Sequence, residues 1–159
     1  MSFRHPGKAE HARRLLDCPP GDCFRQAFWW CESYASATRG TVRLVHGFPA
    51  FQAPGENYGK PFAHAWVEVT TTETWPDGTR LPVITVVDPS VGGIADPRRV
   101  PLGVYYAVGG IERHAPPRRY NGAQAVALLI EHEHYGGWEP YPTGVLCRDR
   151  DTGEIVEAE

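Results

Sequence analysis

Three residue types needed for a nucleophilic thiol site occur in order along this chain. They are a thiol at Cys23, an imidazole at His64 and a carboxylate at Asp88. A cysteine attacks an acyl carbon as its thiolate, a histidine moves the proton, and a carboxylate orients the imidazole and stabilises its charged form. The sequence therefore predicts a catalytic triad that works through an acyl-Cys23 intermediate, with His64 as the base and Asp88 as its orienter.

The first expected element is a helix that begins at Cys23. Residues 19–22 have turn chemistry, and residues 23–38 lack Gly and Pro and carry apolar side chains at helical spacing. We expect Asp22 to be the N-cap. Cys23 then lies in the first turn, where unpaired N–H groups and the helix dipole favour an anion. The same N–H groups are placed to hold the oxyanion of a tetrahedral intermediate.

The other two triad residues lie on expected strands. Side-chain patterning predicts strands over 41–48, 62–71 and 81–87, with turn residues at 75–79 joining the last two as a hairpin. His64 projects from the face opposite the small apolar residues, and Asp88 closes the third strand. Because neighbouring strands lie about 4.8 Å apart, His64 and Asp88 can meet across the hairpin.

The remaining elements complete an α+β domain. The apolar residues 103–108 suggest another short strand, and Asn121 with Gln124 is a capping signature for a helix over 125–136. A helix followed by antiparallel strands and a late helix is typical of the α+β class, here with the N-terminal helix packed on the sheet. We expect a single domain over residues 1–159, with its polar ends, residues 1–10 and 148–159, frayed.

Composition limits the classes of partner. The net charge of −3 and the pI near 6.2 argue against nucleic acid as a partner, and the arginine pairs at 98–99 and 118–119 are expected to be solvated loop charges. The N-terminus lacks an apolar signal region, and no apolar run has a membrane-spanning length. We therefore expect a cytoplasmic protein whose partner is a peptide, a protein or a small amide substrate, with no membrane partner.

The sequence predicts neither a metal nor a cofactor. The four cysteines have no C-x-x-C spacing and are expected to be reduced, and Cys23 and Cys31 are too far apart on one helix for a disulfide. His132 and His134 are two residues apart, so on a helix they point to different faces. The glycine-rich segments fit neither a P-loop nor a dinucleotide fingerprint.

Two further features adjoin the expected site. His46 lies on a predicted strand and is expected to be a core or rim residue, although it is close enough in the pattern to line the same cleft as His64. The tryptophans at 29, 30, 66 and 138 are expected to serve packing rather than to form a substrate groove, and at most one of the consecutive Trp29 and Trp30 is expected to face the core fully. The loop over 49–61 is a candidate wall of the substrate pocket.

Four motifs of this chain resemble those of the transglutaminase-like and papain-like cysteine superfamily. They are Gly21-Asp22-Cys23-Phe24-Arg25-Gln26-Ala27, Leu44-Val45-His46-Gly47, His64-Ala65-Trp66-Val67-Glu68-Val69 and Val87-Asp88-Pro89-Ser90. The resemblance implies a triad of Cys23, His64 and Asp88, with the cysteine at the start of the central helix and the other two on neighbouring strands. It covers roughly residues 20–90, and the small size is similar to that of the leader-peptide proteases of lasso-peptide pathways.

The resemblance leaves more than one function open. The superfamily includes proteases, amidases, deamidases and members that have lost the nucleophile. We expect a cysteine hydrolase or acyltransferase that acts on amide bonds, and the alternative is a catalytically idle module that binds a peptide or protein in the same cleft. Arylamine acetyltransferases share the order Cys, His, Asp, but they are longer than this chain and have an arginine-glycine lead-in that it lacks.

Overall fold

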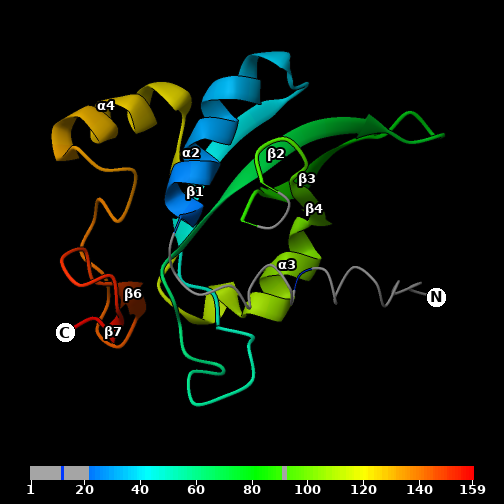
Figure 1. Ribbon diagram of the computed structural model, residues 1–159. Helices are drawn as coiled ribbons and strands as arrows, with labels where there is room; N and C mark the ends of the chain where they lie inside the picture. Colours follow the sequence, from blue (N-terminus) through cyan, green and yellow to red (C-terminus); the bar gives the residue numbers. More distant parts are fainter. Residues whose placement is uncertain (1–11, 13–21, 91–92) are drawn as a thin grey trace.

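The computed structural model describes residue 12 and residues 22–90 and 93–159, and it confirms the α+β class. Helices pack on both faces of a five-stranded antiparallel sheet, and a small hairpin lies beside them near the C-terminus (Figure 1). The expected turn at 19–21, the thiol of Cys18 and the frayed segment 1–10 lie outside the described residues.

The elements follow one another along the chain, with long loops over 48–63 and 133–145. In order they are α2 (Cys23–Tyr34), the 3-10 turn η1 (Ala35–Ala37), β1 (Thr41–Gly47), β2 (His64–Thr74), β3 (Arg80–Asp88), β4 (Arg98–Pro101), α3 (Leu102–Gly109), the 3-10 turn η2 (Ile111–Arg113), β5 (Arg118–Tyr120), α4 (Gly122–His132), β6 (Leu146–Arg148) and β7 (Ile155–Glu157). The large sheet has the strand order β4-β3-β2-β1-β5, and each neighbouring pair is antiparallel.

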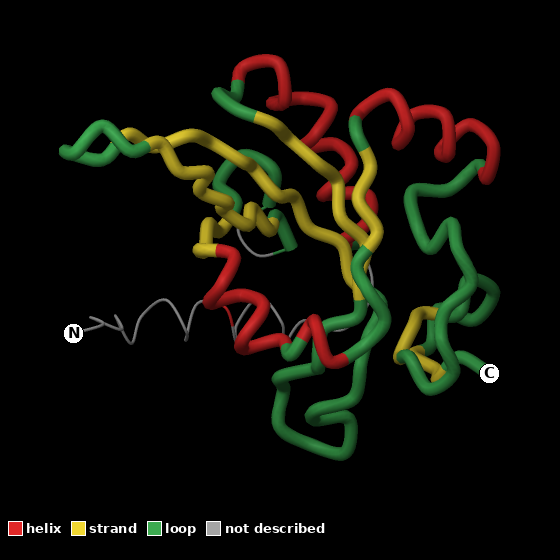
Figure 2. The backbone as a smooth tube through the Cα atoms, turned by 180° about the vertical axis from the view of Figure 1, so that it is seen from behind, coloured by secondary structure: helices red, strands yellow, loops and turns green. Residues whose placement is uncertain are grey.

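The sheet separates two apolar cores. On one face, α2 buries Ala27, Phe28 and Cys31 against β1 and β2, with α4 beside it. Side chains of opposite parity on the same strands form a second core on the other face, which contains α3. Figure 2 shows the helices on the two sides of the strands. Because side chains alternate along a strand, Ala65 faces α2 whereas Trp66 faces α3.

The register brings the ends of three elements together. Gly47 at the end of β1 is opposite His64 at the start of β2, and Val67 is opposite Val87 of β3. His64 and Asp88 therefore lie at the same end of the sheet. The N-terminus of α2 is at this end too, since the pKa of His64 responds to both the charge and a side-chain hydrogen bond of Cys23.

α2 starts where it was expected to start, but the side chain of its N-cap residue does not cap it. Asp22 precedes the helix, and its carbonyl accepts the first helical hydrogen bond, from the Gln26 N–H at 3.0 Å. Its side chain makes no capping bond. The carboxylate instead accepts from Arg25 Nη2 at 2.8 Å, which turns it away from the helical N–H groups. Asp22 is therefore the N-cap residue by position, as expected, but its side chain does not cap the helix.

The segment expected as a strand at 103–108 is a helix. α3 spans Leu102–Gly109, and Gly110 ends it in the left-handed region with φ 55°. A short apolar run has no periodicity that separates a buried strand from a buried helix, which explains why the strand prediction is wrong.

The capping signature at Asn121 correctly predicted the start of α4. The Asn121 side chain accepts from the Gln124 N–H, and the Gln124 side chain accepts from the Asn121 N–H, both at 2.9 Å.

The arginine pairs are in strands rather than loops. Arg98 and Arg99 begin β4 and Arg118 and Arg119 begin β5, at the two edges of the sheet. Because side chains alternate along a strand, the two arginines of each pair point to opposite faces of the sheet. Arg119 reaches the buried carboxylate of Glu68, so this charge has a defined partner.

The C-terminal segment is ordered as a hairpin. β6 and β7 pair antiparallel, and the Ala63 N–H donates to the Leu146 carbonyl at 2.8 Å. Lys60 Nζ also lies 2.7 Å from a carboxylate oxygen of Glu157. Residues 148–159 were expected to fray, but the backbone pairing of 146–157 and this contact with the preceding loop hold them. Among the described residues, no helix has both the length and the apolar character required to cross a membrane.

Candidate active site

Cys23 is the first residue of α2 and is 6% exposed. The helix that it opens fixes its backbone, and its burial restricts the thiol. The N–H groups of a helix's first turn lack partners within the helix, and the positive end of its dipole lies there. This position can stabilise negative charge on sulfur or on a nearby oxygen.

His64 is the first residue of β2 and is 1% exposed. Its Nε2 lies 2.8 Å from Oδ2 of Asp88, at the end of β3. With Nε2 turned to the carboxylate, Nδ1 is the ring nitrogen left for Cys23, whose side-chain hydrogen bond also acts on the imidazole. One ring thus links the thiol to the carboxylate, and the structure brings all three predicted site residues together.

Asp88 is fully buried and its two oxygens are well supplied with donors. Oδ1 accepts from the Ser90 N–H at 3.0 Å and from the Ser90 hydroxyl at 2.6 Å. Oδ2 accepts from the Tyr105 hydroxyl at 2.9 Å as well as facing His64. A carboxylate with this many donors remains ionised and cannot rotate freely, so it fixes the orientation of the imidazole.

The electrostatics favour a charged pair. Burial alone would lower the pKa of His64, but the charges of Asp88 and Cys23 and their hydrogen bonds outweigh it and raise that pKa to about 10. Burial would raise the pKa of Asp88, yet the His64 charge and the hydrogen bonds from His64 and Ser90 bring it below its ordinary value. At neutral pH the site therefore holds an imidazolium beside a carboxylate.

Tyr105 and Ser90 are further members of the candidate site, through their hydrogen bonds to Asp88, and neither was expected there from the sequence. Burial, followed by the Asp88 charge, raises the pKa of Tyr105 well above its ordinary value, so its hydroxyl stays protonated and donates to Asp88. Tyr105 was missed because its helix was expected to be a strand. Ser90 could have been found, because a Ser two residues after an Asp commonly donates back to that carboxylate in a turn.

Aromatic packing holds the imidazole ring from both sides. Phe62 lies 5.2 Å and Trp66 6.1 Å from it, centroid to centroid, and the Trp66 ring is stacked at 29°. The indole of Trp66 in turn donates to Glu68 at 3.3 Å, and Arg119 Nε lies 2.8 Å from the other oxygen of that carboxylate. Trp66 is fully buried, as predicted, and a polar network fixes its orientation.

The other described cysteines have no such surroundings. Cys31 is 4% exposed, and burial, with a smaller effect of Glu32, raises its pKa to about 12. Burial and then Asp149 also raise the pKa of Cys147. Among the described residues Cys23, Cys31 and Cys147 are free thiols. Cys31 resembles Cys23 in burial but not in partners, which makes it a natural internal control.

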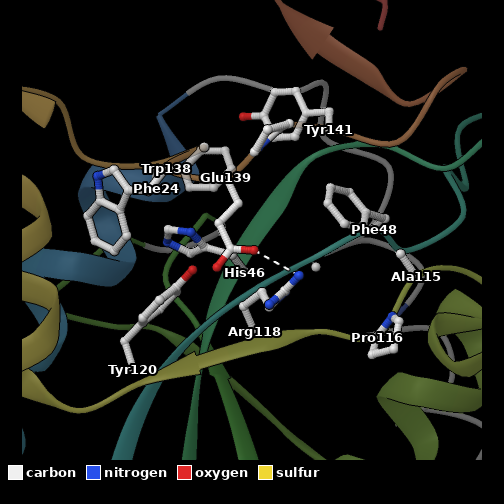
Figure 3. Close-up of a pocket in the computed structure, with 13 residues that line it drawn as sticks. Phe24, His46, Phe48, Ala115, Pro116, Arg118, Tyr120, Trp138, Glu139 and Tyr141 are labelled. Carbon is white, nitrogen blue, oxygen red and sulfur yellow. Dashed lines mark ion pairs between the residues drawn. The ribbon is translucent and has the colours of Figure 1, made fainter. Parts of the chain in front are cut away.

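A pocket lies beside the triad on the α2 face of the sheet (Figure 3). None of Cys23, His64 and Asp88 lines it, but it adjoins them through Phe24, next to Cys23, and through Gly47, opposite His64. His46 lines this pocket and is 7% exposed. Because His46 and His64 lie on opposite faces of their strands, they do not share one cleft.

The described residues offer no metal site. They contain no group of three His, Cys, Asp or Glu side chains that could hold an ion. The rings of His132 and His134 lie 5.7 Å apart between centroids, near the end of α4. The triad is therefore the cluster in the described part of the chain that is best arranged for chemistry.

Comparison with protein-family models, with curated proteins and with solved structures finds no significant match to this chain. The function has to be argued from the site itself.

Proposed function

We propose that this protein is a cysteine-dependent acyl-transfer enzyme that acts on amide bonds, on a papain-like or transglutaminase-like core. The observation that carries the proposal is the His64 ring, which connects a thiol at a helix N-terminus to a buried, fully hydrogen-bonded carboxylate. Any buried carboxylate needs donors, so the informative feature is that His64 lies between this carboxylate and a thiol, where a general base with a fixed tautomer and orientation is required.

The first half-reaction forms a thioester. The Cys23 thiolate attacks the carbonyl carbon, and the new C–S bond places negative charge on the carbonyl oxygen, close to the N–H groups of the first turn of α2. The His64 imidazolium then gives its proton to the leaving nitrogen as the C–N bond breaks. The products are an acyl-Cys23 thioester, a free amine and a neutral His64.

The second half-reaction returns the enzyme to its starting state. Neutral His64 takes a proton from the acceptor, water or an amine, which attacks the thioester carbon. The C–S bond breaks, sulfur leaves as the thiolate, and His64 is again an imidazolium. Water as the acceptor gives a protease or amidase, and an amine gives an acyltransferase.

One observation favours a second candidate, a catalytically idle module that binds a peptide in the same place. Cys23 is only 6% exposed, and a nucleophile must be reached by its substrate. The two candidates predict different chemistry at sulfur, because an idle module has no need of a reactive thiol.

Alkylation rates separate these candidates. At neutral pH we expect iodoacetamide to modify Cys23 at least about tenfold faster than Cys31, which has similar burial but a raised pKa and no imidazole. The substitution His64→Ala should slow the alkylation of Cys23 and leave the alkylation rate of Cys147 unchanged. The rates are measured by peptide mass spectrometry, with Cys18 followed in the same digest. Equal rates at all four thiols would favour the idle module.

A further inference from the structure

The pocket beside the triad is lined largely by aromatic side chains. Its walls include Phe24 of α2, Phe48 after β1, Tyr120 of β5, and Trp138 and Tyr141 of the segment that follows α4. Two prolines, Pro116 and Pro140, complete the apolar surface. Rings pack best against other rings through edge-to-face contacts, so such walls favour an aromatic guest over an aliphatic one.

One wall carries an unpartnered polar atom. His46 is 7% exposed, and its Nε2 is buried without a hydrogen-bond partner. Three rings surround the imidazole: Phe24 at 4.7 Å, Trp138 at 4.8 Å and Tyr120 at 5.1 Å between centroids. A buried polar atom without a partner is costly, and a ligand that supplies the partner recovers that cost.

The imidazole of His46 is neutral. Burial, followed by the charge of His134, lowers its pKa to about 3. In the tautomer that carries the proton on Nδ1, the neutral ring presents Nε2 as an acceptor. For this tautomer a hydroxyl donor on the guest satisfies Nε2, whereas a carboxylate, which only accepts, does not.

The charges at the pocket mouth already pair with each other. Arg118 Nη2 lies 2.9 Å from Glu139 Oε2, and the two side chains are 62% and 43% exposed (Figure 3). This pair leaves neither residue as a free counter-ion for a charged guest. The pocket thus selects a neutral group.

The pocket lies close enough to the thiol to hold part of the same substrate. Phe24 directly follows Cys23, and the pKa of Tyr141 is raised to about 12 by burial and then by the charges of Cys147 and Cys23. The Nε2 atom of His46 lies beneath the accessible surface, so a guest reaches it when the wall at 138–141 shifts. That wall has no regular secondary structure, but Trp138 in it is buried and donates from its indole to the His134 carbonyl at 2.7 Å, so the shift has to move or go around this side chain.

We propose that this pocket binds a phenol side chain, that of a tyrosine in the acyl part of the substrate, with its hydroxyl donating to His46 Nε2. The proposal rests on the acyl-transfer function proposed above and adds the substrate class. His46 is then a specificity residue: it contacts the substrate away from the reacting atoms.

Covalent probes test the preference. Acyloxymethyl ketones react with active-site thiols by forming a C–S bond and releasing a carboxylate, and two series place the varied residue either next to the ketone or one residue further away. In one series we expect the second-order rate of Cys23 modification to be about fivefold higher for tyrosine than for phenylalanine, as for one neutral hydrogen bond. Phenylalanine should in turn exceed leucine, and aspartate and lysine should be slowest.

A matched pair of variants assigns the preference to His46. The variant His46→Phe keeps an aromatic ring but removes the acceptor, so the ratio of the tyrosine rate to the phenylalanine rate should fall from about five to about one. The control His132→Phe changes an exposed histidine on α4 and should leave the advantage intact. Equal rates for tyrosine and phenylalanine in both series, or a preference for a charged residue, would overturn the proposal.

A binding measurement keeps this test independent of catalysis and of the folding of the His46→Phe variant. In the Cys23→Ala protein, the ¹⁵N resonance of His46 Nε2 should shift on titration with N-acetyl-tyrosinamide and much less with N-acetyl-phenylalaninamide. No shift with either amide rejects the pocket assignment. A selective shift together with an unreactive Cys23 in the wild type supports the pocket and rejects the acyl-transfer function.

Discussion

The central feature at the scale of residues is a histidine whose charge is set by its neighbours. His64 is buried, which by itself disfavours the imidazolium, but Asp88 and Cys23 reverse that preference. Asp88 can do so because Ser90 and Tyr105 satisfy its remaining oxygen positions. The charge state that the proposed function requires of His64 is therefore already favoured in the free protein.

Removing the charge of Asp88 should lower the pKa of His64. In the wild type its pKa lies above 6.5, so the ring stays protonated through neutral pH and loses its proton only as the pH approaches the raised value of about 10. In Asp88→Asn the effect of burial prevails, and we expect the titration midpoint of His64 to lie below 6.5. The alkylation of Cys23 at pH 7 should also be slower by about tenfold or more. Histidine NMR titration measures the midpoint.

The hydrogen-bond donor Tyr105 provides the control for this experiment. Tyr105→Phe removes one hydrogen bond to Asp88 but leaves its charge beside His64, so the midpoint should stay above 6.5. A wild-type midpoint near 6.5, unchanged in Asp88→Asn, is the result that this electrostatic account cannot accommodate.

The triad residues could be predicted from the sequence because each lies next to a strong local signal. Cys23 follows a turn and opens a periodic helix, and Asp88 ends an apolar strand joined to the strand of His64 by a tight turn. Tyr105 and His46 depend on which elements meet in space. Their roles come from contacts across the sheet, and a single sequence carries no signal for these contacts.

At the scale of elements, backbone pairing decided where the predictions failed. β4 and β5 are short and begin with arginines, yet they pair with the edges of the sheet through their main chains. Charged residues with one apolar neighbour give no alternating pattern, so short edge strands of this kind look like loops. The prediction for the α3 segment failed for the opposite reason, because its residues are apolar on all sides.

The capping box of α4 is an element that can be tested by itself. Asn121→Ala removes a side-chain acceptor for the Gln124 N–H and should lower the free energy of unfolding by about 1 kcal/mol. Urea denaturation measures the change. Glu131→Ala, an exposed position on the same helix, is the comparison and should shift stability by less than about 0.5 kcal/mol. Equal losses in the two variants would mean that the cap is not stabilising α4.

At the scale of the whole molecule, the proposed catalytic residues and the proposed substrate pocket belong to opposite faces of the sheet. His64 and Asp88 are supported by the core that contains α3, whereas the aromatic pocket belongs to the face covered by α2. Cys23, the first residue of α2, is close to both regions, because its charge acts on His64 and on Tyr141. In the proposed function, a substrate that fills the pocket would thus present its acyl carbon to the end of the sheet.

The account as a whole depends on an acyl group passing through the sulfur of Cys23. Mixing the protein with 4-nitrophenyl acetate should give a burst of nitrophenolate and one acetyl group per chain, mapped to Cys23 by peptide mass spectrometry. In His64→Ala the burst rate should fall about a hundredfold, and in Cys23→Ala the acetyl group at this position should be absent. Acetylation confined to lysines or to Cys147, or a burst that His64→Ala leaves unchanged, would contradict the account.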